Sequence, residues 1–335
     1  RIRIGRETPE GEAFTAFQKY CLDLQQRGIL LAVCSKNDEA IAREGFEHPA
    51  SVLRVEHLSA FAANWEPKSE NIPRIAAALN IGLDSMVFVD DNPAERAIVR
   101  AQLPAVAVPE VGDDVSRFSL ILDRGGYFDV VSLSSDDINR NAQYAANEER
   151  AALSSTYASY GEYLTALAMR AEIAPFRDVY IERITQLTNK TNQFNLTTRR
   201  YTITEIAQIA SDTRYLTLYG RLTDRFGDNG LVSVIIGRKE DSVLHIDLWL
   251  MSCRVIQREM ELAMLDALIE RARDAGIETL TGYYLRTPKN NMVADHYEKL
   301  GFARVSLADD GSRSEWSLEL QPDYSPRNTH IERIA

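Results

Sequence analysis

The sequence predicts an α/β protein in which a parallel sheet is followed by a second domain of the α+β class. In the first 110 residues, short apolar runs alternate with amphipathic helical stretches. Fully apolar strands separated by helices are typical of a parallel sheet that is covered on both faces. Later in the chain, three long strand candidates follow one another across short turns, a pattern typical of an antiparallel meander.

Length and composition agree with two domains. A chain of 335 residues with 45% apolar residues can give each domain its own core. The net charge of −11 argues against binding along a nucleic-acid backbone, which requires a basic surface. Three scattered cysteines form neither a disulfide framework nor a zinc site, and no apolar run is long enough for a membrane span. We therefore expect a soluble, cytoplasmic protein.

The elements of the first domain alternate regularly. Four strands are expected, at residues 29–33, 51–55, 86–89 and 105–108. Helices are expected over 12–26, after the cap residues Asn37 and Asp38, over 72–79 and from Pro93 onward. Ligands of such sheets bind outside the carboxyl ends of the strands, so polar residues at these ends are the first candidates for a site.

The rest of the chain predicts a linker and a second domain. Residues 139–168 are alanine-rich and helical, and another helix is expected over 177–189. The meander RYLTLYGRLTD, GLVSVIIGRKE and SVLHIDLWLMS is followed by a helix over 257–275, the strand TLTGYYL, the helix NNMVADHYEKLGF and two short strands. We place the domains at 1–125 and 171–322, with a helical linker at 126–170 and a tail at 323–335.

Two adjacent acids follow the third expected strand, in VDDNPAER (89–96). Asp90 and Asp91 are oxygen ligands suited to Mg²⁺, which takes one or two carboxylates together with water and phosphate oxygens. The alternative is a helix N-terminal turn, where aspartates satisfy free N–H groups and oppose the helix dipole. These residues alone do not separate the two interpretations.

Two further stretches carry a hydroxyl and an ammonium group, VCSKND (33–38) and NWEPKSEN (64–71). Ser35 is either a phosphoryl-binding hydroxyl or the cap of a turn, and Lys68 is either a phosphate ligand or a solvated lysine. The placement of Ser35, Lys68 and the acid pair at successive strand-end or loop positions favours the functional interpretation. A hydroxyl, an ammonium group and a metal-binding acid pair are what phosphoryl transfer needs for positioning and charge neutralisation.

The order VCSKND, NWEPKSENI and FVDDNPAER resembles motifs two to four of the haloacid dehalogenase (HAD) superfamily of phosphoryl-transfer enzymes. The sequences of these motifs are closer still to the FkbH-like branch of the superfamily (subfamily IIIC). The resemblance extends from GRETPEGEAF to about residue 320. It implies a HAD-like Rossmannoid sheet joined to an acetyltransferase-like domain. Proteins of this branch resembling the chain take a glyceryl unit from the acyl phosphate 1,3-bisphosphoglycerate, remove phosphate and load the acyl group onto an acyl carrier protein. Some relatives load lactate or serve other polyketide-type pathways.

By position, the resemblance implies roles in the first domain. Ser35 would hydrogen-bond the transferring phosphoryl group and Lys68 would neutralise its charge. Asp90 would help to hold Mg²⁺, with Asp91 as a second ligand or as a residue that orients one.

The resemblance also gives two neighbouring residues a place in the site. Lys36 and Asn37 would contact the distal phosphate or carboxyl part of the substrate. The other interpretation, a surface lysine and a helix cap, is equally open.

One family motif is missing. HAD enzymes resembling this chain have a first strand that ends in DxDxT, whose first aspartate is the nucleophile, and no segment before Ser35 has that form. We expect the motif-one strand to lie outside this sequence, because the other three motifs are intact. The alternative is a catalytically silent scaffold that only recruits a carrier protein.

The thiols offer candidates for a thioester relay. Cys34 is by default a buried structural cysteine, but Lys36, Lys68 and a metal could stabilise its thiolate. Cys253, after the last strand of the meander, is the competing candidate. Cys21 lies on the apolar face of its helix and is expected in the core.

The second domain resembles the GCN5-related acetyltransferase (GNAT) fold, through SCRVIQREMELAML, TLTGYYL and NNMVADHYEKLGF. That family presents backbone N–H groups of a glycine-containing loop to the pyrophosphate of coenzyme A. RVIQRE has no glycine, which argues against an N-acyltransferase that uses coenzyme A. Arg254 and Arg258 would instead grip the phosphate of a carrier protein's phosphopantetheine arm, or be solvated at a helix start.

The segment TNKTNQFNLTTRR (188–200) is dense in amides and hydroxyls. It resembles the FkbH-like branch closely, and its side chains could line a polar substrate pocket between the domains or form a capped, solvated loop. The candidate residues are Asn189, Lys190, Asn192, Gln193 and Asn195.

Overall fold

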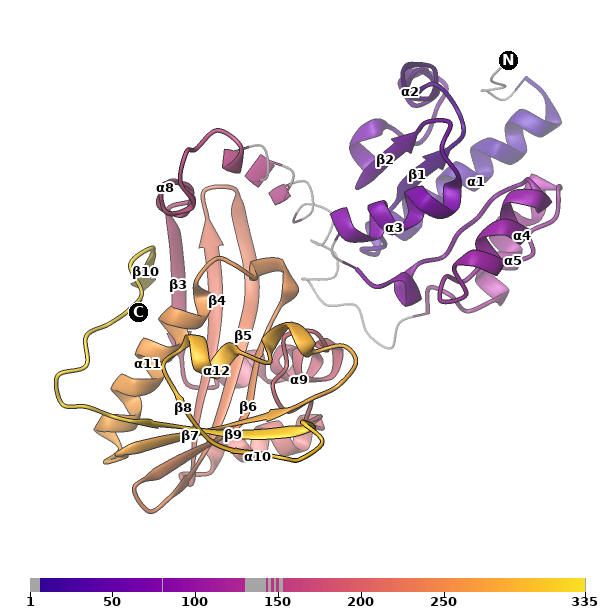
Figure 1. Cartoon of the computed structure of the whole chain (residues 1–335). Helices are drawn as coiled ribbons and strands as arrows, with labels where there is room; N and C mark the ends of the chain where they lie inside the picture. Colours follow the sequence, from indigo (N-terminus) through magenta and orange to yellow (C-terminus); the bar gives the residue numbers. More distant parts are fainter. Residues whose placement is uncertain are drawn as a thin grey trace. The chain divides into compact units, whose positions relative to one another are not determined.

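The computed structural model describes residues 7–79, 81–129, 143, 146, 147, 149, 150 and 153–334. The chain forms two compact units, Arg1–Glu148 and Glu149–Ala335, which follow the colour bar from indigo to yellow in Figure 1. Part of the helical linker expected over 126–170 lies outside the described residues. None of the described helices is long and apolar enough to cross a membrane.

The first unit alternates strand and helix. Its strands β1 (Ala32–Ser35) and β2 (Ala60–Ala63) pair in parallel, and Val87 and Ala107 form a separate parallel bridge. Its helices are α1 (Pro9–Gln26), α2 (Glu39–Glu47), α3 (Lys68–Ala78), α4 (Pro93–Gln102) and α5 (Phe118–Arg124), with 3-10 turns at Val55–His57, Leu83–Ser85 and Val115–Arg117. The predicted parallel α/β arrangement is confirmed.

Local caps explain where two of these helices begin. The Asp38 carboxylate accepts a hydrogen bond from the backbone N–H of Ala40, and the Asn92 amide oxygen accepts one from Ala94. Such caps satisfy donors that have no partner within the helix. Pro93 occupies the first turn of α4, where its missing N–H costs nothing.

The strand predicted at 51–55 is wrong, because the strand beside β1 is residues 60–63 instead. The amide oxygen of Gln18, on α1, accepts hydrogen bonds from the N–H groups of Val52 and Leu53, at 2.7 and 3.1 Å. These groups are therefore bonded to a side chain and not to a neighbouring strand. The apolar pattern of SVLRV gave no sign of that long-range bond.

Strand β1 is also less buried than predicted. Ala32 is exposed and residues 33–35 are only half-buried, whereas a strand of a doubly covered sheet is expected to be buried. Within the described residues, β1 has a paired strand on one edge only. Cys34 nevertheless packs against a core cluster that contains Ile72, Phe88 and Val99.

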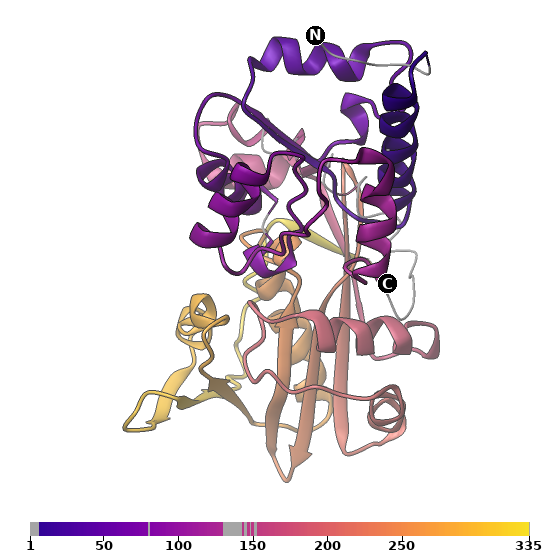
Figure 2. The same ribbon diagram turned by 90° about the vertical axis from the view of Figure 1, so that its right-hand side faces the viewer.

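The second unit is built on one eight-stranded sheet, in the order β10-β3-β4-β5-β6-β7-β9-β8. The strands are β3 (Met169–Ala174), β4 (Tyr215–Asp224), β5 (Gly227–Glu240), β6 (Val243–Met251), β7 (Thr279–Leu285), β8 (Ala303–Leu307), β9 (Arg313–Glu319) and β10 (Ile331–Ile334). The predicted antiparallel meander is confirmed as β4–β5–β6, whose long strands run side by side (Figure 1, Figure 2). The fold class is thus a parallel α/β unit followed by an α+β unit.

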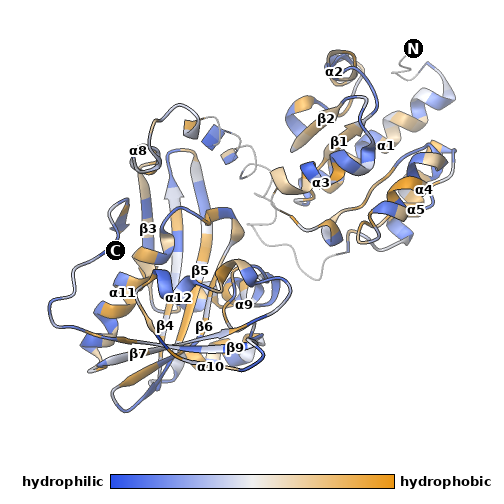
Figure 3. Ribbon diagram, in the orientation of Figure 1, coloured by the Kyte–Doolittle hydropathy of each residue, from blue (hydrophilic) through white to orange (hydrophobic). Residues whose placement is uncertain are grey.

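Helices cover both faces of this sheet. They are α8 (Tyr160–Ala166), α9 (Ile181–Lys190), α10 (Ile203–Ser211), α11 (Met260–Asp274) and α12 (His296–Lys299), with 3-10 turns at Asp178–Tyr180, Cys253–Val255 and Asn291–Val293. Along β6, Leu248 and Leu250 pack in the cluster of α9 and α10, whereas Trp249 packs in that of α11. This alternation is the period of two that a strand imposes, and α11 carries both orange and blue residues in Figure 3.

A short segment of the chain fills the point where β6 and β7 diverge. Their parallel pairing ends at Ile246 and Gly282. Beyond it, residues 194–196, here called the inserted segment, pair with β6 on one side, with Leu196 N–H donating to Trp249 O at 3.1 Å. On the other side, Leu285 N–H donates to Leu196 O at 2.8 Å.

The tail predicted at 323–335 contains strand β10, which pairs in parallel with β3 at the sheet edge. Asp266 of α11, only 5% exposed, holds the chain that leads to it. Its carboxylate accepts hydrogen bonds from the hydroxyl of Tyr324 and from the N–H groups of Arg327 and Asn328. One buried carboxylate thus fixes the C-terminal segment on the helix.

Replacing Asp266 by alanine is expected to release this segment. The change leaves buried donors without an acceptor, which costs about 2–3 kcal/mol of unfolding free energy. Hydrogen exchange followed by mass spectrometry should show lost protection over residues 324–334. Asp274→Ala, at an exposed position of the same helix, is the control, and unchanged protection in the Asp266 variant would contradict the expectation.

Candidate functional site

Lys68 and Asp90 form the centre of the candidate site in the first unit. Lys68 is the first residue of α3, and Asp90 follows the segment that carries the Val87 bridge. The Lys68 ammonium group forms an ion pair with Oδ2 of Asp90, and the side chains are only 13% and 6% exposed. Asp90 Oδ1 accepts a hydrogen bond from the N–H of Asn92 at 2.9 Å. An ammonium group and a carboxylate therefore share one sheltered position.

Ser35 ends β1 and is half-buried. Its backbone oxygen accepts a hydrogen bond from Asn64 N–H at 3.1 Å, which connects it to the loop that leads to Lys68. Within the described part of the chain, its hydroxyl makes no hydrogen bond, so this donor is available to a ligand. Asn37 accepts a hydrogen bond from the N–H of Asp38 at 2.9 Å, as a turn residue does.

Lys36 is tied to a residue that sequence reasoning missed. Its ammonium group lies 2.6 Å from Oε1 of Glu95, whose side chain is 11% exposed. Glu95 stands in the first turn of α4, where an acid is favoured by the helix dipole alone. Because the helix dipole already explains an acid at this position, the sequence gives no sign of the Lys36–Glu95 ion pair. This ion pair joins the end of β1 to the start of α4.

Arg96, the next residue, was also missed. It is only 3% exposed, and its Nη1 donates hydrogen bonds to the backbone oxygens of Asp90 and Asp91, at 2.8 and 3.0 Å. Its Nη2 forms an ion pair with Glu110. The available signal was an arginine in a helix's first turn, a position that the dipole disfavours.

Asp90 and Asp91 fit a hard divalent cation that takes only a few of its ligands from the protein. No group of three or more histidines, cysteines or acids that could hold a metal occurs among the described residues. Asp90 and Asp91 alone offer two carboxylates, the number that Mg²⁺ takes when water and phosphate oxygens complete its shell. Asp91 is exposed, and Asp90 divides its oxygens between Lys68 and Asn92.

The Cys34 thiol lies beside this centre but is poorly suited to nucleophilic attack. Its Sγ is 3.8 Å from the backbone oxygen of Lys68. Burial raises the pKa of Cys34 to about 11, and the opposing charge of Lys68 is a smaller influence. Burial likewise raises the pKa of Cys21 to about 12. Cys253 lies half-buried in the 3-10 turn after β6.

Alkylation by iodoacetamide tests this property of Cys34. Because its pKa lies about two units above that of a free thiol, the rate near pH 7.5 should be about 100-fold lower. The rate should rise about tenfold per pH unit until the pH approaches 11, since the thiolate is the reacting form. Peptide mass spectrometry measures the rate, and the urea-unfolded chain is the control. A fast reaction in the folded protein at neutral pH would instead favour the thioester relay.

In the second unit, Arg258 is buried and paired. Its Nη1 lies 3.1 Å from Oδ2 of Asp224 and 3.1 Å from Oδ1 of Asn229. Arg150 also bonds Asp224, through Nε and Nη2 at 2.9 and 2.7 Å. Arg254 donates from Nε to the Ser252 hydroxyl at 3.1 Å. Arg258 is therefore part of a buried cluster, called here the Asp224 cluster (Arg150, Asp224, Asn229 and Arg258).

The loop between β6 and α11 has an unusual backbone. Gln257 and Glu259 adopt φ values of 69° and 59°, in the left-handed region that favours glycine. Non-glycine residues held there cost free energy and persist only where the surroundings enforce them. Arg258 stands between the two, so the Asp224 cluster is one contact that holds this loop.

Side chains of the amide-rich segment (188–200) form hydrogen bonds with other residues of the same unit. Asn189 donates to the backbone oxygens of Thr185 and Tyr201, and Asn192 accepts from Arg200. Asn195, in the inserted segment, is fully buried and accepts from Thr198 N–H at 2.8 Å. Lys190 is exposed and Gln193 is half-buried. A role of these five residues in binding stays a prediction.

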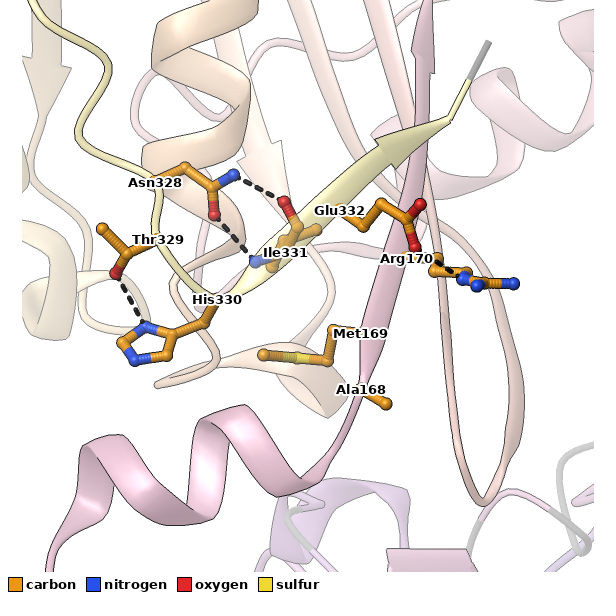
Figure 4. Close-up of a pocket in the computed structure, with 8 residues that line it drawn as sticks. All are labelled: Ala168, Met169, Arg170, Asn328, Thr329, His330, Ile331 and Glu332. Atoms are coloured by element: carbon orange, nitrogen blue, oxygen red, sulfur yellow. Dashed lines mark hydrogen bonds and ion pairs between the residues drawn. The ribbon is translucent and has the colours of Figure 1, made fainter.

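A shallow pocket of about 370 Å³ lies between β3 and β10 (Figure 4). It is lined by Ala168, Met169, Arg170, Asn328, Thr329, His330, Ile331 and Glu332. His330 Nδ1 lies 2.7 Å from Oε2 of Glu259, and Arg170 pairs with Glu332 at the rim. None of the predicted site residues lines this pocket.

No protein-family model matches the chain, and no curated protein matches it. Among solved structures, it is similar to the N-terminal part of a Bacteroides fragilis protein, which contains a phosphatase domain and is complexed with Mg. The two are 46% identical, with a TM-score of 0.38 over 39% of this chain and 35% of that one. The match thus spans about a third of that structure.

The chain is also similar to two further solved structures. The ribosomal-protein-S18-alanine N-acetyltransferase of Escherichia coli is 15% identical, over 48% of this chain and 98% of that one, with a TM-score of 0.35. Ard1 of Thermoplasma volcanium is 18% identical, over 45% and 98% of the two chains, with a TM-score of 0.35.

Proposed function

We propose that the chain belongs to an Mg²⁺-dependent enzyme of the FkbH-like branch, with a HAD-like domain at 1–125 and a GNAT-like domain at 171–322. It would remove phosphate from a glycolytic acyl phosphate, 1,3-bisphosphoglycerate, and load the glyceryl or a related hydroxyacyl unit onto an acyl carrier protein. The observations that carry the proposal are the sheltered ion pair of Lys68 and Asp90 and the half-buried Ser35 at the end of β1, whose hydroxyl makes no hydrogen bond in the described part of the chain. None of the three cysteines, all of which lie in the described part of the chain, forms a disulfide, and this fits the reducing cytoplasm that we propose as its location.

The residues of the first unit have distinct parts in this chemistry. The Ser35 hydroxyl would donate a hydrogen bond to a phosphoryl oxygen, and the Lys68 ammonium group would neutralise its charge. Asp90 and Asp91 would hold Mg²⁺, which when bound supplies further charge neutralisation at the phosphoryl oxygens. Lys36 would exchange Glu95 for the distal anionic part of the substrate. The attacking carboxylate that the family implies is not among the described residues.

Acyl transfer needs a thiol and a leaving group. The thiol of the carrier protein's phosphopantetheine would lose its proton to water and attack the acyl carbonyl, so that a carbon–sulfur bond forms, the bond to the acyl phosphate oxygen breaks and that phosphate leaves. Hydrolysis of the 3-phosphate ester by water would release the second phosphate and leave the glyceryl unit on the sulfur. The arm's own phosphate would bind near Arg254, because Arg258 is already held by Asp224. This division of roles refines the expectation that both arginines grip the arm.

A silent carrier-binding scaffold and a simple Mg²⁺-dependent phosphatase are the alternatives. A scaffold without chemistry has no need of a buried lysine–aspartate pair, whose desolvation is costly. An N-acyltransferase that uses coenzyme A is disfavoured by the loop RVIQRE, which has no glycine and therefore does not favour a close approach of its backbone to a pyrophosphate.

The test uses the full-length gene product with Mg²⁺, 1,3-bisphosphoglycerate and a phosphopantetheinylated carrier protein. Intact mass spectrometry of the carrier protein should detect the mass of one glyceryl unit, and phosphate release should accompany it. Phosphate release without a mass change would leave the simple phosphatase. If neither occurs, the enzymatic proposal is wrong, and binding of the carrier protein alone would leave the scaffold.

A further inference from the structure

The buried guanidinium of Arg96 connects two loops at the end of the candidate site. Its Nη1 donates to the backbone oxygens of Asp90, Asp91 and Gly112, at 2.8, 3.0 and 3.3 Å. Its Nη2 pairs with the carboxylate of Glu110. Four acceptors from two separate segments thus converge on a single side chain.

Helix stability does not explain this arginine. A positive charge in the first turn of a helix faces the positive end of the helix dipole. Arg96 is also almost fully desolvated, and its Nε has no hydrogen-bond partner among the described residues. Both features cost free energy, so the contacts of Arg96 with the backbone must supply the compensation.

The contacts hold a bend of the backbone at the acid pair. In an extended strand, successive carbonyl groups point in opposite directions and successive side chains lie on opposite faces. The carbonyl oxygens of Asp90 and Asp91 instead meet the same nitrogen of Arg96. The chain therefore leaves the extended conformation at this point, and Arg96 holds it there.

We infer that Arg96 is a positioning residue for a divalent-cation site: by fixing the backbone of Asp90 and Asp91, it holds their two carboxylates ready for one metal ion. This inference rests on the proposed Mg²⁺ site. Arg96 acts only through the backbone, since its guanidinium carries the same sign of charge as the cation. Groups that orient metal ligands typically change metal affinity about 10–100-fold when they are removed.

Isothermal titration calorimetry of Mg²⁺ on the full chain tests this role without any turnover. Arg96→Lys keeps the charge but has one nitrogen in place of two, so it loses the simultaneous contact of Nη1 with the carbonyl groups and of Nη2 with Glu110. We expect about 10–100-fold weaker binding. The matched control is Arg100→Lys on the same helix. Arg100 also pairs with Glu110 but is 47% exposed and does not contact Asp90 or Asp91, so its variant should bind Mg²⁺ like the wild type.

Asp90→Asn separates failure of the metal site from failure of the inference. If the wild type does not bind Mg²⁺, or binds it as the Asp90 variant does, the proposed metal site is wrong. If Asp90→Asn weakens binding and a folded Arg96→Lys protein binds like the wild type, the inference on Arg96 is wrong.

Thermal unfolding shows whether Arg96→Lys folds. Should it not fold, Glu110→Gln decides, because the Glu110 side chain is 65% exposed and its loss only loosens Arg96. We expect several-fold weaker Mg²⁺ binding by that variant, and wild-type affinity would overturn the inference.

Discussion

Replacing Lys68 by methionine is expected to lower kcat/KM for phosphate release by about 100-fold or more. Methionine keeps the approximate length of the side chain but carries no charge, so under the proposed function the phosphoryl group would lose its neutralising partner. Asp90, at 8% exposure, loses its counter-charge in the same change. Phosphate release from 1,3-bisphosphoglycerate by the full-length gene product, with saturating Mg²⁺, measures the effect.

Variants of two other lysines serve as comparisons for the Lys68 variant. Lys19→Met, at an exposed position of α1, should leave kcat/KM unchanged. Lys36→Met should act mainly on KM, because Lys36 is half-exposed and would contact a distal part of the substrate. If the Lys68 variant is folded and stays within threefold of the wild type, Lys68 does not neutralise the phosphoryl group.

The meeting of Lys68 and Asp90 could be predicted from the sequence for a physical reason. Asp90 follows an apolar run of a parallel α/β pattern, and such a fold brings the carboxyl ends of its strands to one edge. Lys68 was expected at the same place because NWEPKSENI resembles the third family motif, so the error in the strand at 51–55 did not affect it. That error arose because the amide of Gln18 competes for the backbone of that segment, a bond that joins residues far apart in the sequence.

The partners of the site residues could not be predicted in the same way. Glu95 and Arg96 stand where a helix start is expected, and local rules explain an acid there without reference to Lys36. The burial of Arg258 depends on Asp224, at the end of a strand that precedes it by more than thirty residues. Buried ion pairs between distant elements follow from tertiary packing, and neither composition nor periodicity records them.

Asp224→Asn is expected to destabilise the second unit by about 3–5 kcal/mol, because it leaves two buried arginines without their shared carboxylate. The Asp224 side chain is fully buried, and those of Arg150 and Arg258 are 4% and 8% exposed. Urea unfolding followed by tryptophan fluorescence reports on this unit, since Trp249 is buried there and Trp65 of the first unit is already 76% exposed. Asp228→Asn removes an exposed carboxylate paired with Arg221 and should cost at most about 1 kcal/mol.

The pH dependence of this difference tests its electrostatic origin. Burial alone would raise the pKa of Asp224, but hydrogen bonds and the charge of Arg150 hold it below its usual value. A carboxyl group with a lowered pKa stabilises the fold above its unfolded pKa of about 4, and this contribution is lost as the pH falls through the folded pKa. The gap in unfolding free energy between wild type and Asp224→Asn should therefore be full at neutral pH and shrink below about pH 4. A gap that stays constant down to pH values where the wild type unfolds would mean that packing, and not charge, accounts for the role of Asp224.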